Sequence, residues 1–312
     1  MTEISQLILH AGRAGVELAF FVLLPVMIVM LTFMRLLEAR GVLDWVVSRI
    51  SPWLLPFGIP GLGVFALIQI LFVSFAAPLA TLTMMNKSGI SRRHIAATLA
   101  LVLAAAQANV TFPMSAVGLN GLLTLLISAL SAILAAALTY HWFARNLPED
   151  DQLPEPVPEH PVAEDTKGVL AVINAAGKEA FNISVTAIPM LVLALLLVNI
   201  LRSSGTIGFI EGWLVPVFNL FDLPSSMLLP IITKYIAGGT AMMGVTVDYI
   251  NQGLLTKAEL NQIAGFLIHP LDLAGIAIYL SAGRRVASVL KPALYGAVLA
   301  ILFRSAAHFL VF

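Results

Sequence analysis

Long runs of apolar residues constrain this sequence more than any other feature. Leu18–Met34, Leu62–Met85 and Leu119–Leu138 are predominantly apolar, and about 20 such residues cross the hydrocarbon core of a bilayer as a helix. Only 11% of the residues are charged, whereas a soluble domain carries about 25%. The sequence therefore predicts an all-α integral membrane protein with several crossings.

Charge and cysteine content exclude several classes of function. The formal net charge is +0, so the chain lacks the basic excess that marks a nucleic-acid-binding protein. It contains no cysteine, which removes disulfides, Cys–zinc sites and thiol nucleophiles. The sequence has no HExxH motif and no GxSxG elbow, so we predict neither an enzyme nor a cofactor. The first apolar run continues into a full span, which favours a multi-pass protein of the cell (inner) membrane over a cleaved signal.

One segment of the chain is clearly polar. Residues 146–167 read NLPEDDQLPEPVPEHPVAEDTK, an acidic, proline-rich stretch. Such a composition cannot bury itself and predicts a solvated linker. The linker divides the chain into a first membrane repeat at 1–145 and a second at 168–312.

The two halves match each other in their glycines and prolines. Because the pairs recur at one offset, they predict an internal repeat. The pairs are Pro25 and Pro189, Gly41 and Gly205, Pro52 and Pro216, and Pro60 and Pro224, with Glu17 and Glu179 two positions out of register. We predict a shared structural role for the two glutamates, close to the membrane interface.

Each half contains the same five parts in the same order. They are a first span (14–37; 178–202), an amphipathic segment with an internal proline (42–57; 206–221), a stretch broken by small residues (61–88; 225–252), a span with polar residues in its middle (93–117; 258–282) and a last span (119–143; 290–312). Trp45, Trp53 and Trp213 are typical interfacial anchors for the amphipathic segments.

The third part decides whether the repeats are parallel or inverted. The small residues at 74–78 and 237–241 suit the tight tips of re-entrant hairpins. With such hairpins, most arginines and lysines gather on one side, and only Arg13, Arg202, Lys257 and Arg304 lie on the other. A single crossing at this position gives a weaker bias, so the positive-inside rule favours two inverted repeats with about six full crossings and a cytoplasmic linker.

The opening of each half carries a family resemblance. Residues 34–45 read MRLLEARGVLDW after Pro25, and residues 201–209 read LRSSGTIGF after Pro189. These blocks resemble the "Gate" (nucleoside recognition) domain family, which includes part of the concentrative nucleoside transporters, the membrane part of ferrous iron transporter B, and spore maturation proteins A and B. The resemblance implies a concentrative nucleoside transporter-like fold, with an interfacial helix, a re-entrant hairpin and a broken helix in each inverted repeat.

Substrates of inverted-repeat transporters bind near the bilayer midplane, where broken helices leave backbone groups free. In the first half, Gln107 and Thr111 have i, i+4 spacing, and Pro113 frees the carbonyl of Asn109, which predicts a helix break there. The alternative for these side chains is routine interhelical hydrogen bonding. The substrate-binding candidates of this half are Gln69, Ser74, Gln107, Asn109 and Thr111.

The second half carries charged candidates. Lys234 precedes the predicted hairpin tip, with Thr233 and Thr240 around it, and His269-Pro270-Leu271-Asp272 interrupts the polar span. A charge at bilayer depth costs at least about 2.5–3.5 kcal/mol, so such groups are usually paired and line a pathway. Two interpretations remain open: a structural Lys234–Asp272 ion pair, or a Lys234 that meets an anionic substrate while His269 and Asp272, three residues apart and able to share a face, relay a proton or coupling cation.

The leading prediction is a secondary transporter of a small polar organic solute, nucleoside-like or a small organic anion, coupled to protons or cations. Its partners would be the solute, the lipid bilayer, and further copies of the chain or a second membrane subunit. One alternative is a non-transporting subunit of a membrane complex, as in the spore maturation proteins. The other is a divalent-metal permease, which the missing cysteines weaken and which His269, Asp272 and the methionines keep open.

Overall fold

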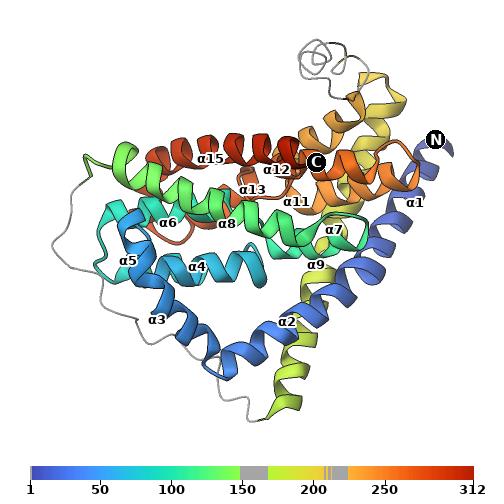
Figure 1. Cartoon of the computed structure of the whole chain (residues 1–312). Coiled ribbons are helices and arrows are strands. Elements are labelled where there is room, and N and C mark those ends of the chain that lie inside the picture. Colours follow the sequence, from blue (N-terminus) through green and yellow to red (C-terminus); the bar gives the residue numbers. More distant parts are fainter. Residues whose placement is uncertain (1, 148–167, 207–208, 210–211, 213–223) are drawn as a thin grey trace.

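The computed structural model describes residues 2–147, 168–206, 209, 212 and 224–312. These residues are largely helical, and no strand occurs among them (Figure 1). Residues 148–167 of the predicted linker at 146–167 lie outside them, as do Trp213 and most of the predicted segment 206–221. Six described stretches are long and apolar enough to cross a membrane: Ser5–Ala39, Arg92–Ala116, Gly121–Phe143, Val169–Leu201, Ser225–Asn251 and Leu290–Val311.

The first span is one long helical stretch built from α1 (Thr2–Glu17), η1 (Leu18–Leu23) and α2 (Leu24–Ala39). The middle element is a π-helix. Its place next to Pro25 has a physical reason, because the proline nitrogen cannot donate the usual α-helical hydrogen bond. The equivalent span of the second half is α9 (Val169–Ser203), which packs against both α1 and α2 (Figure 1).

An amphipathic helix, α3 (Val42–Leu54), follows the first span. The chain turns into it at Gly41, whose φ of +67° favours glycine. Leu43 and Val47 are buried on one face, whereas Trp45 and Trp53 are 62% and 78% exposed. After η2 (Leu55–Phe57) the chain bends by 108° into the next helix. This geometry suits an in-plane helix anchored by aromatic side chains.

The next two helices of the first half form a re-entrant hairpin. They are α4 (Gly61–Phe72) and α5 (Pro78–Lys87). The hydroxyl of Thr81 donates to Oε1 of Gln69 at 2.7 Å, so the chain reverses direction between two residues that a straight helix would hold far apart. Each helix is too short to span a bilayer alone. The tip at 73–77 coincides, within one residue, with the predicted tip.

The equivalent part of the second half is η4 (Ser225–Met227) followed by α11 (Leu228–Asn251). α11 is interrupted at Gly238, whose φ of +85° and ψ of 176° lie outside the helical region. Only glycine adopts this backbone conformation readily. The break falls within the predicted tip at 237–241.

Both polar spans are broken helices. In the first half α6 (Arg92–Ala104) is separated from α7 (Ala108–Ala116), and in the second half α12 (Lys257–Leu267) is separated from α13 (Leu273–Leu280) and the short α14 (Arg284–Ser288). Ser91 caps α6, and Thr256 with Glu259 forms a capping box on α12. The break predicted at Asn109 is displaced, because α7 stays helical through Pro113 and the chain leaves the helix at 105–107 instead.

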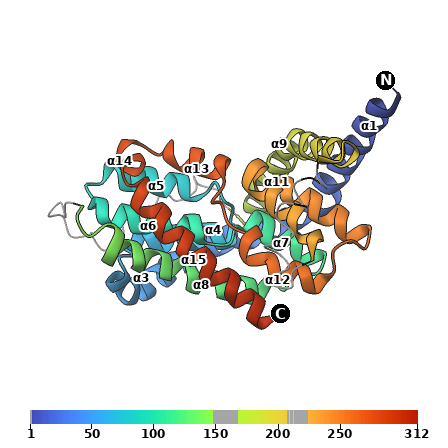
Figure 2. The same ribbon diagram turned by 90° about the horizontal axis from the view of Figure 1, so that it is seen from above.

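The last spans are α8 (Gly121–Leu138), extended by η3 (Thr139–Phe143), and α15 (Leu290–Val311). Figure 2 shows α15 lying beside α6 and α8, and these elements contact one another. The approach is close: a Cβ on Gly265 of α12 would lie 2.5 Å from Cα of Ser305, and one on Gly296 would lie 2.0 Å from Oγ1 of Thr139. The last spans therefore pack directly on the broken helices.

Candidate functional site

The two helix breaks meet inside the protein. The side-chain amide of Gln107, in the first break, donates to the backbone oxygen of His269, in the second, at 3.2 Å. Gln107 also lies against the break of α11, where a Cβ on Gly239 would come within 2.4 Å of its Nε2 atom. Three interruptions, far apart in the sequence, thus converge on one glutamine.

The centre of the site is an ion pair between Lys234 and Asp272. Nζ of Lys234 lies 2.5 Å from Oδ2 of Asp272, and the two residues are 0% and 7% exposed. The other carboxylate oxygen of Asp272 accepts the N–H of Gly275 at 2.8 Å and caps α13. The ion pair of the structural interpretation is therefore present, and it joins α11 to the second broken helix.

Gly238 lies beside this ion pair. A Cβ at this position would lie 3.8 Å from Oδ1 of Asp272. Because glycine has no side chain, the carboxylate faces bare backbone at the break of α11. Gly238 therefore brings the bare backbone of the α11 break against the buried ion pair.

His269 is fully buried next to the ion pair. Its Nδ1 accepts the N–H of Leu271 at 3.1 Å, and its Nε2 lies 3.4 Å from the hydroxyl of Tyr235. The imidazole thus bridges the backbone of the break and the side chain of Tyr235. His269 and Asp272 both lie within the non-helical break at 268–272, so the expected common helical face does not exist.

The tip of the hairpin α4–α5 is held by both broken helices. Oδ1 of Asn109 accepts the N–H of Phe75 at 3.1 Å, and the hydroxyl of Tyr279 donates to the carbonyl of Phe75 at 2.5 Å. Tyr279 was not among the residues predicted from the sequence. The available signal was its position seven residues after Asp272, which places both at one face of a helix.

The remaining predicted residues have different surroundings. Thr111 donates to the carbonyl of Gln107 at 2.9 Å, and Thr233 donates to a carbonyl of its own helix at 2.7 Å. Ser74 is buried at the hairpin tip, and Thr240 is half-buried just after the break of α11. Gln69 lines a cavity of about 250 Å³ together with Arg35, Glu38 and Glu179. Gln69 therefore faces the first spans, while Gln107, Asn109, Lys234, His269 and Asp272 surround the breaks.

Arg304 departs most from the sequence prediction. The charge count assigned it to the side of the membrane opposite most other basic residues. In the structure it is fully buried within α15, and its guanidinium group donates to carbonyl oxygens of α6 and α12. A buried arginine that binds backbone carbonyls is held by packing, so it adds nothing to the charge count of the positive-inside rule.

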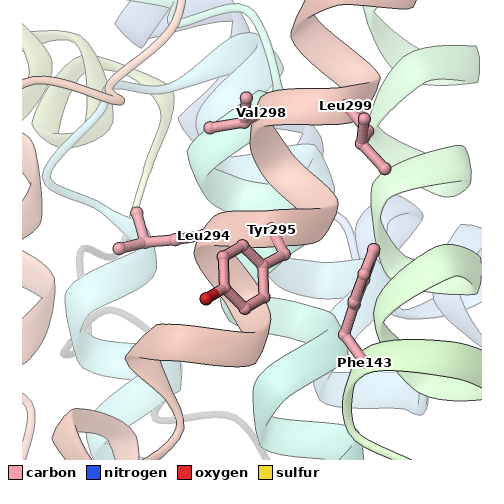
Figure 3. Close-up of a pocket in the computed structure, with 5 residues that line it drawn as sticks. All are labelled: Phe143, Leu294, Tyr295, Val298 and Leu299. Atoms are coloured by element: carbon pink, nitrogen blue, oxygen red, sulfur yellow. The ribbon is translucent and has the colours of Figure 1, made fainter.

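Two further features do not belong to the cluster at the breaks. An apolar pocket of about 540 Å³ lies between η3 and α15, lined by Phe143, Leu294, Tyr295, Val298 and Leu299 (Figure 3). Its lining offers a polar solute little beyond one tyrosine hydroxyl. Within the described residues there is no group of three His, Cys, Asp or Glu side chains that could hold a metal ion.

Glu179 forms an ion pair with Arg35 and so connects α9 to α2. We expect Glu179→Gln to change the free energy of unfolding by less than about 1 kcal/mol, because pairs this accessible to solvent contribute little. Both side chains are about one-third exposed, at 31% and 35%. A thermal unfolding comparison with the unmodified protein checks this, and a loss of several kcal/mol would contradict it.

Comparison with known proteins supports the architecture. No family model matches the chain. Spore maturation protein B of Bacillus subtilis (strain 168) is 36% identical over 74 residues, which cover 24% of this chain and 41% of that protein. The chain thus matches less than half the length of this relative.

Solved structures match nearly the whole chain. The transporter CNTnw in an outward-facing state has a TM-score of 0.68 at 17% identity, covering 99% of this chain and 84% of that one. CNTnw in an inward-facing substrate-bound state has a TM-score of 0.67 at 17% identity, covering 99% and 83%. The chain has the concentrative nucleoside transporter fold.

This fold confirms the predicted fold class of two inverted repeats with re-entrant hairpins and broken helices. Together with the match to spore maturation protein B, it confirms the resemblance to the Gate group. It also makes the chain a multi-pass membrane protein. At 17% identity the concentrative nucleoside transporter fold itself says nothing about which solute binds.

Proposed function

We propose that this protein is a secondary transporter of a small polar organic solute in the cell (inner) membrane. The observation that carries the proposal is the buried cluster where the two broken helices meet, with the Lys234–Asp272 ion pair at its centre. Buried charges within membrane spans usually line a transport path. The breaks also leave backbone groups free to bind a solute near the midplane.

The cluster favours a solute that carries a carboxylate or another anionic group. Such a group can take over the ammonium of Lys234, while Asp272 keeps its hydrogen bond to Gly275. The amide group of Gln107, beside the break of α11, supplies a further donor. A nucleoside-like solute with an acidic heterocycle and a small carboxylate both fit this description.

Replacement of Asp272 by the solute at Lys234 also provides a means of coupling solute binding to the binding of a proton or cation. When an anion occupies Lys234, the carboxylate of Asp272 loses its counter-ion in a buried environment. An uncompensated buried charge is costly, so binding of a proton or a cation at Asp272 becomes favourable at the same time. His269 and Tyr235, next to the pair, form the nearest route for that proton.

The first test is the thermal stability of the detergent-purified protein with nucleosides, nucleobases and small carboxylates at two pH values. We expect at least one small anion to stabilise it by about 2–4 kcal/mol at 100 to 1,000 times its dissociation constant. Lys178→Ala, at an exposed position of α9, serves as the matched control for Lys234→Ala and should keep the effect. A stabilisation that survives Lys234→Ala would contradict the proposed site.

The natural absence of cysteine allows a second test by single-cysteine labelling. Ser74→Cys places a thiol at the buried hairpin tip, and Ser288→Cys places one at an exposed position of α14. We expect a solute that stabilises the protein to change maleimide labelling at position 74 by about tenfold, since lids of this kind open and close with binding. Labelling at position 288 should stay constant, and equal changes at both positions would count against a gating hairpin.

A second candidate function is a non-transporting subunit of a membrane complex. The likeness to spore maturation protein B favours it. This candidate expects no stabilising solute across the panel and a stable membrane partner in mild-detergent purification. A homo-oligomer in the same purification is the partner that the transporter proposal expects.

A further inference from the structure

Arg304 connects the two broken helices on their α15 side. It lies in α15 and is 0% exposed. Nη1 donates to the carbonyl of Ala104, the last residue of α6, at 2.8 Å. Nη2 donates to the carbonyls of Ala264 and Ile268, in the last turn and at the C-cap of α12, at 3.1 and 2.5 Å.

Two of the three acceptors, the carbonyls of Ala104 and Ile268, lie where the helices end, whereas the carbonyl of Ala264 also accepts the N–H of Ile268. The last carbonyls of a helix have no intrahelical partner and carry partial negative charge. In a membrane such groups find no water, so they need a donor from the protein. Two helix ends meet at one point here, and a planar guanidinium group with donors on both arms can serve both ends at once.

A closed ring of contacts results. From Arg304 it runs through Ala104 into the first break, reaches Gln107, crosses by the amide of Gln107 to the carbonyl of His269, and returns through Ile268 to Arg304. Arg304 closes the ring on the α15 side, and Gln107 closes it on the side of the candidate site. A shift of either helix end would therefore move both breaks.

A serine of the other last span assists at one break only. The hydroxyl oxygen of Ser128, in α8, accepts the N–H of Ala106 and lies 3.4 Å from Nη1 of Arg304. Ser128 thus fixes the backbone of the first break, and its hydrogen bonds within the described residues do not reach the second. Ser128 therefore supports one break, whereas Arg304 supports both.

We infer that Arg304 is a positioning residue, which holds the two helix breaks in register so that Gln107 and the Lys234–Asp272 pair face one another. This inference rests on the proposed function only in taking the breaks as the solute site. The geometric part stands on the contacts of Arg304 itself, so it can be tested without a known solute.

The test is hydrogen–deuterium exchange of the full-length protein in detergent, followed over residues 104–108 and 268–272. Local opening of either break requires the charge-assisted hydrogen bonds of Arg304 to break. Arg304→Gln removes these bonds, so we expect it to speed exchange at both breaks by about tenfold or more. Arg304→Lys keeps the charge but lacks the fork, so it should also loosen the breaks. Ser305→Ala is the matched control, since Ser305 is buried in α15 and donates only to Ile301 of its own helix.

Two further variants keep the test decisive if Arg304→Gln folds poorly. Ser128→Ala should speed exchange at 104–108 and leave 268–272 unchanged. The double variant Arg304→Gln with Gln107→Ala should exchange little faster than Arg304→Gln alone, because residues of one network are not additive. Equal effects of Ser305→Ala, or additive effects of the double variant, would overturn the inference. If the exchange results are as expected but no solute binds the protein, only the proposed function is rejected, and the inference about Arg304 stands.

Discussion

Asp272→Asn is expected to cost about 3–5 kcal/mol of folding free energy, since it leaves a buried ammonium without its counter-ion. The ammonium of Lys234 is fully buried, and Asp272 is the partner that the structure gives it. Asparagine keeps a side-chain oxygen that can still accept the N–H of Gly275. The cap of α13 is therefore retained, and the variant isolates the loss of charge.

A double replacement separates stability from function at this pair. Lys234→Met combined with Asp272→Asn removes both charges and should recover most of the lost stability, because neutral replacements of buried ion pairs are often tolerated. It should still bind no anionic solute, since the ammonium is absent. Denaturant or thermal unfolding measures the first effect and the solute panel the second. Full stability of the Asp272→Asn variant alone would show that Lys234 does not depend on this carboxylate.

The sequence predicted the fold through signals that are local and physical. Apolar runs set the spans, and the matched prolines and glycines predicted the repeat. The hairpin tip and the break at Gly238 followed from small residues, since a tight turn needs them. These features depend on a few neighbouring residues, which is why they can be recognised without knowing the packing.

The contacts of the site depend instead on pairs that lie far apart in the chain. The ion pair joins residues 38 positions apart, and Gln107 meets a backbone carbonyl 162 positions away. A backbone acceptor has no residue type, so sequence patterns cannot point to it. The same holds for Arg304, whose partners are all backbone oxygens except Ser128.

Helical spacing rules also failed where the helix itself ends. His269 and Asp272 were expected to share a face at i, i+3, but residues 268–272 are not helical. Pro113 was expected to break its helix, yet α7 includes it. Residues 105–107 leave the helix instead, where Ser128 and Arg304 bind the freed backbone groups. Where a break falls is thus decided by tertiary partners as well as by proline.

The second large effect concerns the turn that presents Asp272. Gly275→Ala is expected to destabilise the protein by about 1–3 kcal/mol and to weaken solute binding strongly, because overpacking a tight site forces the backbone to move. A Cβ on Gly275 would lie 2.0 Å from the carbonyl oxygen of Pro270. That carbonyl accepts the N–H of Asp272 at 2.9 Å. The added methyl group therefore displaces the residue that pairs with Lys234.

Gly177→Ala is the matched control for this substitution. Gly177 lies in the helix α9, and a Cβ there would meet no atom within 4 Å. Alanine is favoured over glycine in a helix by up to about 1 kcal/mol, so this variant should be neutral or more stable. Thermal unfolding and the solute panel measure both variants under identical conditions. If Gly275→Ala matched Gly177→Ala in both measurements, the turn at 270–275 would not hold Asp272 in place, and the proposed arrangement of the site would be wrong.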